Sequence, residues 1–208
     1  MCYSINSSYF NWVKTFLIGI CLLIMYNDYD TIWVVSFILV FSQIQIFESI
    51  AWANMDHINN NKAINSLLIL LLLLQPIVNT IFAYKKTKNK KLFYLLLMLI
   101  ISLIYLIYLN KNINIKPGVN GHLTWLTKNN KFILNNIIIV SIYLIGLLYP
   151  FVYLDNNFNK IILISFGVIT FIYSLYNYYK SHEFSSYWCH VSTTMMIILA
   201  ITKLIIKT

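Results

Sequence analysis

Residues Thr31 to Met55 read TIWVVSFILVFSQIQIFESIAWANM, and Glu48 is the only charged side chain among them. An α-helix rises about 1.5 Å per residue, so a helix of this length reaches across the roughly 30 Å hydrocarbon core of a bilayer. Backbone polar groups find no water there and must be satisfied within a helix or a closed barrel. The stretch is about twice as long as a barrel strand and lacks alternation, which indicates a helix.

Six more stretches have the same character. The chain of 208 residues is 60% hydrophobic and 10% charged, whereas a soluble domain carries about a quarter charged residues. We therefore predict an all-α integral membrane protein, one domain over residues 1–208 that forms a bundle of seven transmembrane helices. The longest linker, residues 110–131, contains a Pro-Gly turn signal. The predicted spans are residues 11–26, 31–55, 64–84, 92–109, 132–154, 161–179 and 185–206.

The net charge of +9 comes from lysine alone, since the chain contains no arginine. Lysines that flank membrane spans meet lipid headgroups, so we expect the lipid bilayer as a partner and no nucleic acid. Five lysines gather in one short loop after Tyr84: Lys85, Lys86, Lys88, Lys90 and Lys91. The excess of lysine in cytoplasmic loops then predicts a cytoplasmic C-terminus and an N-terminus outside.

Glu48 is the only acidic residue well inside a predicted span. An ionisable group within a bilayer costs roughly 2.5–3.5 kcal/mol and normally faces protein or water. Gln45, Glu48 and Trp52 are spaced i, i+3 and i+7, so they share one helix face. Two interpretations remain: a polar contact that fixes helix packing, or a functional site. In either case we expect Glu48 to point into the bundle.

Two other spans carry polar residues. Span 64–84 contains Gln75, Pro76 and Asn79. Pro76 removes a backbone hydrogen bond and is expected to kink the helix, and the two amides, four residues apart, either bond between helices or line a polar pocket. Span 185–206 begins SSYWCHVSTT, where the aromatic residues suit a membrane interface but Cys189 and His190 do not. Histidine changes charge near neutral pH and is a common metal ligand.

The predicted topology brings these polar residues to one side of the membrane. Helix 31–55 ends there, and helices 64–84 and 185–206 begin there, so Glu48 and His190 lie at similar depths of about 10 and 8 Å. We predict a polar pocket that opens to the N-terminal side. Its candidate residues are Gln45, Glu48, Trp52, Gln75, Asn79, Ser186, Trp188, Cys189 and His190.

Three functions compete for such a pocket. The protein could bind or pass a small polar ligand, ion or proton, as a channel or transporter does, without a cofactor. It could be a metal-dependent membrane hydrolase that uses zinc, or a structural membrane protein without small-molecule chemistry. The heptahelical alkaline ceramidases and progestin-receptor-like proteins set three histidines and an aspartate within helices, but here Asp28, Asp30, Asp56 and Asp155 lie at span ends or in loops. The first function is favoured over enzymatic activity.

Retinal binding was also considered. Tyr149-Pro150 and Lys203 resemble features of microbial rhodopsins. Lys203 lies close to the C-terminus, however, and Leu199 stands one turn before it where those proteins have an aspartate. Retinal is therefore not expected.

Three motifs together resemble an uncharacterised family of small heptahelical membrane proteins found in giant DNA viruses and protists. The abundant Lys, Asn, Ile and Tyr are similar to the residue usage of such AT-rich genomes. The resemblance implies the seven-helix fold, a viral origin and a host or virion membrane, and it implies no established activity. The residues that match are Gln45, Glu48, Trp52, Gln75, Pro76, Ser186, Tyr187, Trp188 and Cys189.

Overall fold

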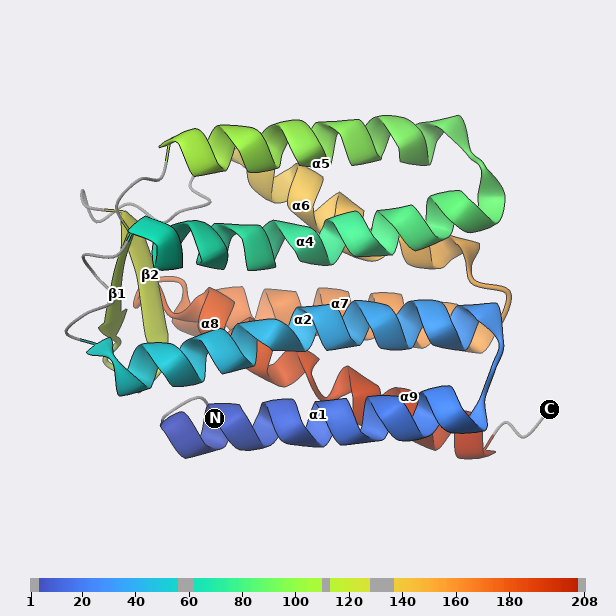
Figure 1. Ribbon diagram of the computed structural model, residues 1–208, viewed down its shortest axis with the longest axis horizontal. Coiled ribbons are helices and arrows are strands. Elements are labelled where there is room, and N and C mark those ends of the chain that lie inside the picture. Colours follow the sequence, from blue (N-terminus) through green and yellow to red (C-terminus); the bar gives the residue numbers. More distant parts are fainter. Residues whose placement is uncertain (1–3, 56–61, 110–112, 128–136, 206–208) are drawn as a thin grey trace.

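The structure is a computed structural model that describes residues 4–55, 62–109, 113–127 and 137–205. Its helices run along the long axis of the molecule, and a β-hairpin lies at one end (Figure 1). The helices are α1 (Ile5–Met25), α2 (Tyr29–Ala53), α4 (Lys62–Thr87), α5 (Lys90–Leu109), α6 (Ile137–Leu148), the 3₁₀ helix η1 (Tyr149–Tyr153), α7 (Asn157–Tyr178), α8 (Phe184–Ser192) and α9 (Met195–Ile205). The strands are β1 (Ile113–Pro117) and β2 (Leu123–Thr127).

Six helical segments in the described part of the chain are long and apolar enough to cross a membrane: Ile5–Met25, Tyr29–Ala53, Ser66–Thr87, Lys90–Tyr108, Asn157–Tyr178 and Phe184–Leu204. The predicted helical bundle of a multi-pass membrane protein is therefore confirmed. Predicted span 132–154 contains a shorter apolar helix, Val140–Tyr153, so the count of seven spans stays a prediction.

The bundle has inner and outer helices. Of the most apolar window of α2, 67% is buried, and the value for α4 is 56%, against 28% for α1, α5 and α7. α2 packs against α1, α4 and α8, and its rings form the core with η1, where Phe37 meets Phe151 edge to face at 5.2 Å. Polar side chains on α2 therefore face protein on most sides.

Ion pairs hold together the end of the bundle where α2 begins. The Lys86 ammonium contacts the Asp30 carboxylate at 2.6 Å and the Asp155 carboxylate at 2.8 Å. Lys203 contacts Asp28 at 2.9 Å. These contacts connect the start of α2 with the end of α4, the turn before α7, and α9, and we name this end the ion-paired end.

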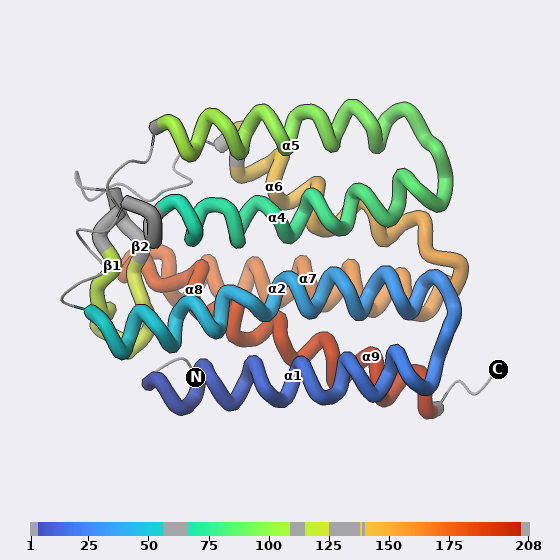
Figure 2. The backbone as a smooth tube through the Cα atoms, viewed as in Figure 1, coloured from blue at the N-terminus to red at the C-terminus, as the bar shows by residue number. Residues whose placement is uncertain are grey.

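Two predicted spans are not continuous α-helices. In span 132–154, α6 gives way to η1 at Tyr149, because Pro150 has no amide hydrogen and its ring disfavours an α-helix interior; residues 132–136 lie outside the described part. In span 185–206, α8 ends at Ser192 and α9 begins at Met195, and the backbone changes direction between them (Figure 2).

The break between α8 and α9 has a local cause. The hydroxyl of Thr193 donates to the carbonyl of His190 at 2.7 Å, and that of Thr194 donates to the carbonyl of Val191 at 2.6 Å. The amides of both threonines also bond three residues back instead of four. Such side-chain bonds compete with the helical pattern, and two in succession tighten this turn.

The β-hairpin lies in the linker for which the sequence predicts only a turn. β1 and β2 pair antiparallel, with Ile115 opposite Trp125, and Gly121 takes a φ of 81° in the turn between them. α1 and α8 begin and α2 ends at this end of the bundle (Figure 1). We name it the hairpin end.

Candidate functional site

Glu48 lies inside the bundle, as the sequence predicts. Its side chain and that of Gln45 are both 0% exposed, and the Gln45 amide donates to the Glu48 carboxylate at 3.3 Å. The buried thiol of Cys189 on α8 lies within electrostatic range of this carboxylate. The predicted meeting of α2 with the Trp-Cys-His segment therefore exists in the structure.

Gln75 joins this group through a residue that the sequence analysis did not single out. The hydroxyl of Tyr143 on α6 donates to the Gln75 side-chain carbonyl at 2.7 Å, and the Tyr143 ring lies 6.4 Å from that of Trp188. Among the described residues, the buried Gln75 Nε2 has no hydrogen-bond partner. Tyr143 could not be told from the other apolar and aromatic residues of its helix in the sequence.

Asn79 has a different role from the one predicted for it. It accepts a hydrogen bond from the Trp33 indole at 2.6 Å and donates to the Leu147 carbonyl at 2.8 Å. Trp33 precedes Glu48 on α2 by about four helical turns. The structure therefore does not bring Asn79 to Glu48, and Asn79 fastens α4 to α2 and α6 instead.

Trp188 lies in the core of the bundle. It is 4% exposed, its indole donates to the Thr170 hydroxyl at 3.1 Å, and its ring packs against Phe171 at 4.9 Å. Two residues earlier, Ser186 is wholly buried, and its hydroxyl has no hydrogen-bond partner within the described residues. These contacts favour a packing role for Trp188 within the bundle.

His190 is connected to α1 by a chain of hydrogen bonds. The Lys14 ammonium donates to Asn11 Oδ1 at 2.8 Å, and Asn11 Nδ2 lies 2.7 Å from His190 Nδ1. Lysine can only donate, so the amide oxygen of Asn11 is fixed as the acceptor and its NH₂ as the donor. His190 Nδ1 must then accept, which places the ring proton of neutral His190 on Nε2.

This chain links the protonation of two basic groups. A proton on His190 Nδ1 would face the Asn11 NH₂, and turning the amide over would bring that NH₂ against the Lys14 ammonium. The observed amide orientation therefore accommodates a charged Lys14 with a neutral His190, and a charged His190 would require the amide to turn over. Asn11 was not among the residues predicted from the sequence, although its position one turn before Lys14 was a usable signal.

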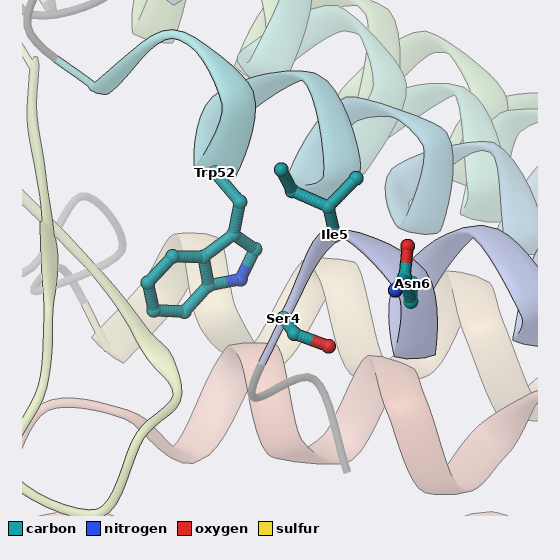
Figure 3. A pocket seen from close by; sticks show the side chains of 4 residues that line it. All are labelled: Ser4, Ile5, Asn6 and Trp52. Atoms are coloured by element: carbon teal, nitrogen blue, oxygen red, sulfur yellow. The ribbon is translucent and has the colours of Figure 1, made fainter.

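Trp52 lies closer to the surface than Glu48 does. It follows Glu48 by four residues and so lies one turn further along the same face. Its half-buried side chain lines a surface recess of about 340 Å³ together with Ser4, Ile5 and Asn6 of the α1 start (Figure 3). The recess lies at the hairpin end, the side on which the sequence predicts the pocket to open.

A second buried carboxylate lies directly before α8. Glu183 is 0% exposed, and its oxygens accept hydrogen bonds from the backbone amides of Asn120 and His122, each at 3.1 Å. A side chain at Gly118 would collide with this carboxylate, so glycine allows the hairpin to approach it. Glu183 thus fastens the hairpin to the helix bundle.

His122 is enclosed by the same contact. It is 0% exposed and meets the rings of Tyr178 and Tyr187 edge to face at 5.4 and 5.2 Å. Burial lowers the pKa of His122 from 6.5 to about 4, although the nearby Glu183 carboxylate acts in the opposite direction. The sequence places both residues on this side of the membrane but has no signal that pairs them.

The residues that a metal site or a retinal site would use are not gathered in one place within the described part of the chain. Within the described residues, no group of three or more His, Cys, Asp or Glu side chains is close enough to hold a metal ion. Lys203, the candidate for retinal attachment, contacts Asp28 at the ion-paired end and lies over the Tyr26 ring at 5.4 Å.

No protein-family model, curated protein or solved structure matches the chain. The resemblance to small heptahelical proteins of giant viruses and protists therefore stays a prediction. The candidate site rests on the geometry around Glu48 alone.

Proposed function

We propose that the protein binds or passes a small polar ligand or a proton between α2, α4 and α8, with Glu48 as the ionisable group. One observation carries the proposal: a carboxylate that is 0% exposed lies within an apolar, membrane-spanning helix and within electrostatic range of a buried thiol. Ionisable side chains inside membrane helices are costly and typically belong to ligand or proton pathways. The buried Gln75 Nε2 adds a donor that a polar ligand could satisfy.

The break after α8 supports the same site. Interrupted helices at membrane depth occur where the backbone is buried in protein or lines a cavity, and transporters bind ions and substrates at such breaks. Here the break begins at Thr193, three residues after His190 and four after Cys189. The interruption thus lies on the helix that carries Cys189 and His190, within one turn of both residues.

A proton fits this site better than a larger ion does. Lys14 and His190 share one amide in a way that admits a single extra charge, so a proton gained at one group disfavours a charge at the other. His190 also lies within electrostatic range of His122 in the hairpin. Charges on α1, α8 and the hairpin thus influence one another.

A flux measurement tests the proposal. The purified chain is reconstituted into phosphatidylcholine vesicles that contain a pH-sensitive dye, and the internal pH is followed after a step in external pH. We expect the wild type to pass protons and Glu48→Gln to slow the flux by about tenfold or more. Ser49→Ala is the matched control, because the Ser49 hydroxyl bonds within its own helix at 2.9 Å, and it should behave as the wild type.

Thermal unfolding in detergent separates a functional role from a packing role. Glu48→Gln should keep the wild-type melting temperature within a few degrees, because the amide retains the shape and one acceptor. A variant that melts much earlier but keeps its flux would make Glu48 a packing residue. A flat wild-type trace between about pH 5 and 8 would contradict proton passage.

A further inference from the structure

We propose that the turn between α4 and α5 is a binding site for the headgroups of anionic phospholipids. The site consists of the ammonium groups of Lys85, Lys88, Lys90 and Lys91, which we name the lysine turn. It lies at the ion-paired end, away from Glu48, and the proposal does not depend on the proposed function.

The four lysines of the lysine turn are exposed, unlike their neighbour Lys86. Lys86 is neutralised by Asp30 and Asp155 at 2.6 and 2.8 Å. Among the residues that the structure describes, no carboxylate lies within 4.0 Å of the four exposed ammonium groups. The turn therefore presents four uncompensated positive charges within seven residues.

The position of the turn brings these charges to the membrane surface. α4 ends at Thr87 and α5 begins at Lys90, and both helices are apolar and long enough to span. Phe93 and Tyr94, one turn into α5, are exposed large aromatic side chains of the kind that gathers at the headgroup level. The ammonium groups thus lie where phosphate groups of lipids are found.

Helix stability explains Lys85, which lies in the last turn of α4, but not the lysines that follow it. Lys90 and Lys91 occupy the first turn of α5, where the helix dipole disfavours positive charge. Lys88 takes a φ of 54°, in the left-handed region that favours glycine, and its ammonium lies 5.6 Å from the Tyr84 ring centroid. An anionic partner would relieve the repulsion between these like charges.

Lipid is the partner that the geometry favours over a free anion. Lysines beside a membrane span attract anionic leaflets, each adding to the attraction while it stays within a Debye length of the surface. Four flexible ammonium groups on one turn match several headgroups of a charged leaflet. All four ammonium groups are exposed, so they do not enclose a single buried anion site.

The test measures which lipids stay bound to the full chain. Detergent-purified protein is mixed with equal amounts of phosphatidylglycerol and phosphatidylcholine, and the bound lipids are counted by native mass spectrometry. We expect the wild type to prefer phosphatidylglycerol by about tenfold. Lys90→Gln with Lys91→Gln should lose much of that preference, and the fourfold glutamine variant of the lysine turn should lose all of it.

Two control variants distinguish the effect of the lysine turn from the effect of net charge and from misfolding. Lys116→Gln with Lys180→Gln changes the net charge equally at exposed sites of the hairpin end, and it should keep the wild-type preference. A fourfold arginine variant of the lysine turn should also keep it, which excludes misfolding as the cause of a loss. An unchanged preference in the fourfold glutamine variant would overturn the proposal, as would inorganic phosphate that displaces the lipid at equal concentration.

Discussion

The protein contains two carboxylates, Glu48 and Glu183, that are both 0% exposed but lie in different surroundings. Glu183 accepts hydrogen bonds from two backbone amides of the hairpin, whose positions the fold sets. Glu48 accepts one from the Gln45 side chain and lies within electrostatic range of the thiol of Cys189. Equal burial can therefore serve two purposes: Glu183 fastens two parts of the chain, whereas Glu48 lies among side chains that can rearrange or exchange protons.

The largest expected effect is the loss of stability in Glu183→Ala. The substitution leaves the buried amide of His122 and the partly buried amide of Asn120 without their acceptor, which should lower the free energy of unfolding by about 3 kcal/mol. Thermal unfolding in detergent measures the change. Asp155→Asn, which alters an exposed carboxylate, is the control and should cost less than about 1 kcal/mol. A Glu183→Ala protein as stable as that control would contradict the fastening role.

Gly118→Ala should have the next largest effect. Its Cβ would collide with the Glu183 carboxylate, so the hairpin must move away, at a cost of about 2 kcal/mol. We expect faster chymotrypsin cleavage after Trp125 of β2 and, because Glu48 is not involved, unchanged proton flux. Equal cleavage rates in the two proteins would show that the hairpin does not need this close approach.

A smaller effect is expected from the pH dependence of the stability that His122 contributes at the hairpin contact. Its sign follows from the pKa of His122, which is about 4 when folded and 6.5 ordinarily. The unfolded chain thus binds the proton more readily, so His122 contributes stability that is present above about pH 6.5 and is lost as the pH falls towards 4. His122→Phe keeps the aromatic packing and removes the titration.

Melting temperatures of the wild type and His122→Phe, measured from pH 7.5 to 4.5, check this expectation. The difference between the two proteins should grow in favour of the variant as the pH falls, while other titrating groups cancel. A constant difference would mean that His122 is not held neutral by its surroundings.

The sequence predicts the helices well and the contacts between them only in part. Apolar stretches about 20 residues long, bounded by Lys, Asn and Asp, place most helix ends within a few residues, because the bilayer thickness sets their length. The burial of Glu48 follows from the cost of a charge in lipid. These inferences use local composition and need no knowledge of distant contacts.

What the sequence misses depends on contacts between distant segments. Glu183 meets the hairpin across about 60 residues, and Tyr143 reaches Gln75 from another helix. Asn79 has the spacing of a pocket residue but bonds Trp33, because helix rotation decides which neighbour a polar side chain meets. The break at Thr193 did have a local signal, since consecutive threonines compete for helical carbonyls.

The most direct test of the contrast between the two carboxylates is an infrared titration of the protein in lipid vesicles from pH 8 to 5. The carbonyl band of a protonated carboxyl group should appear in the wild type and in Glu183→Gln, and it should be absent from Glu48→Gln. A band that persists in Glu48→Gln, or that vanishes only in Glu183→Gln, would contradict the assignment of Glu48 as the group that exchanges protons.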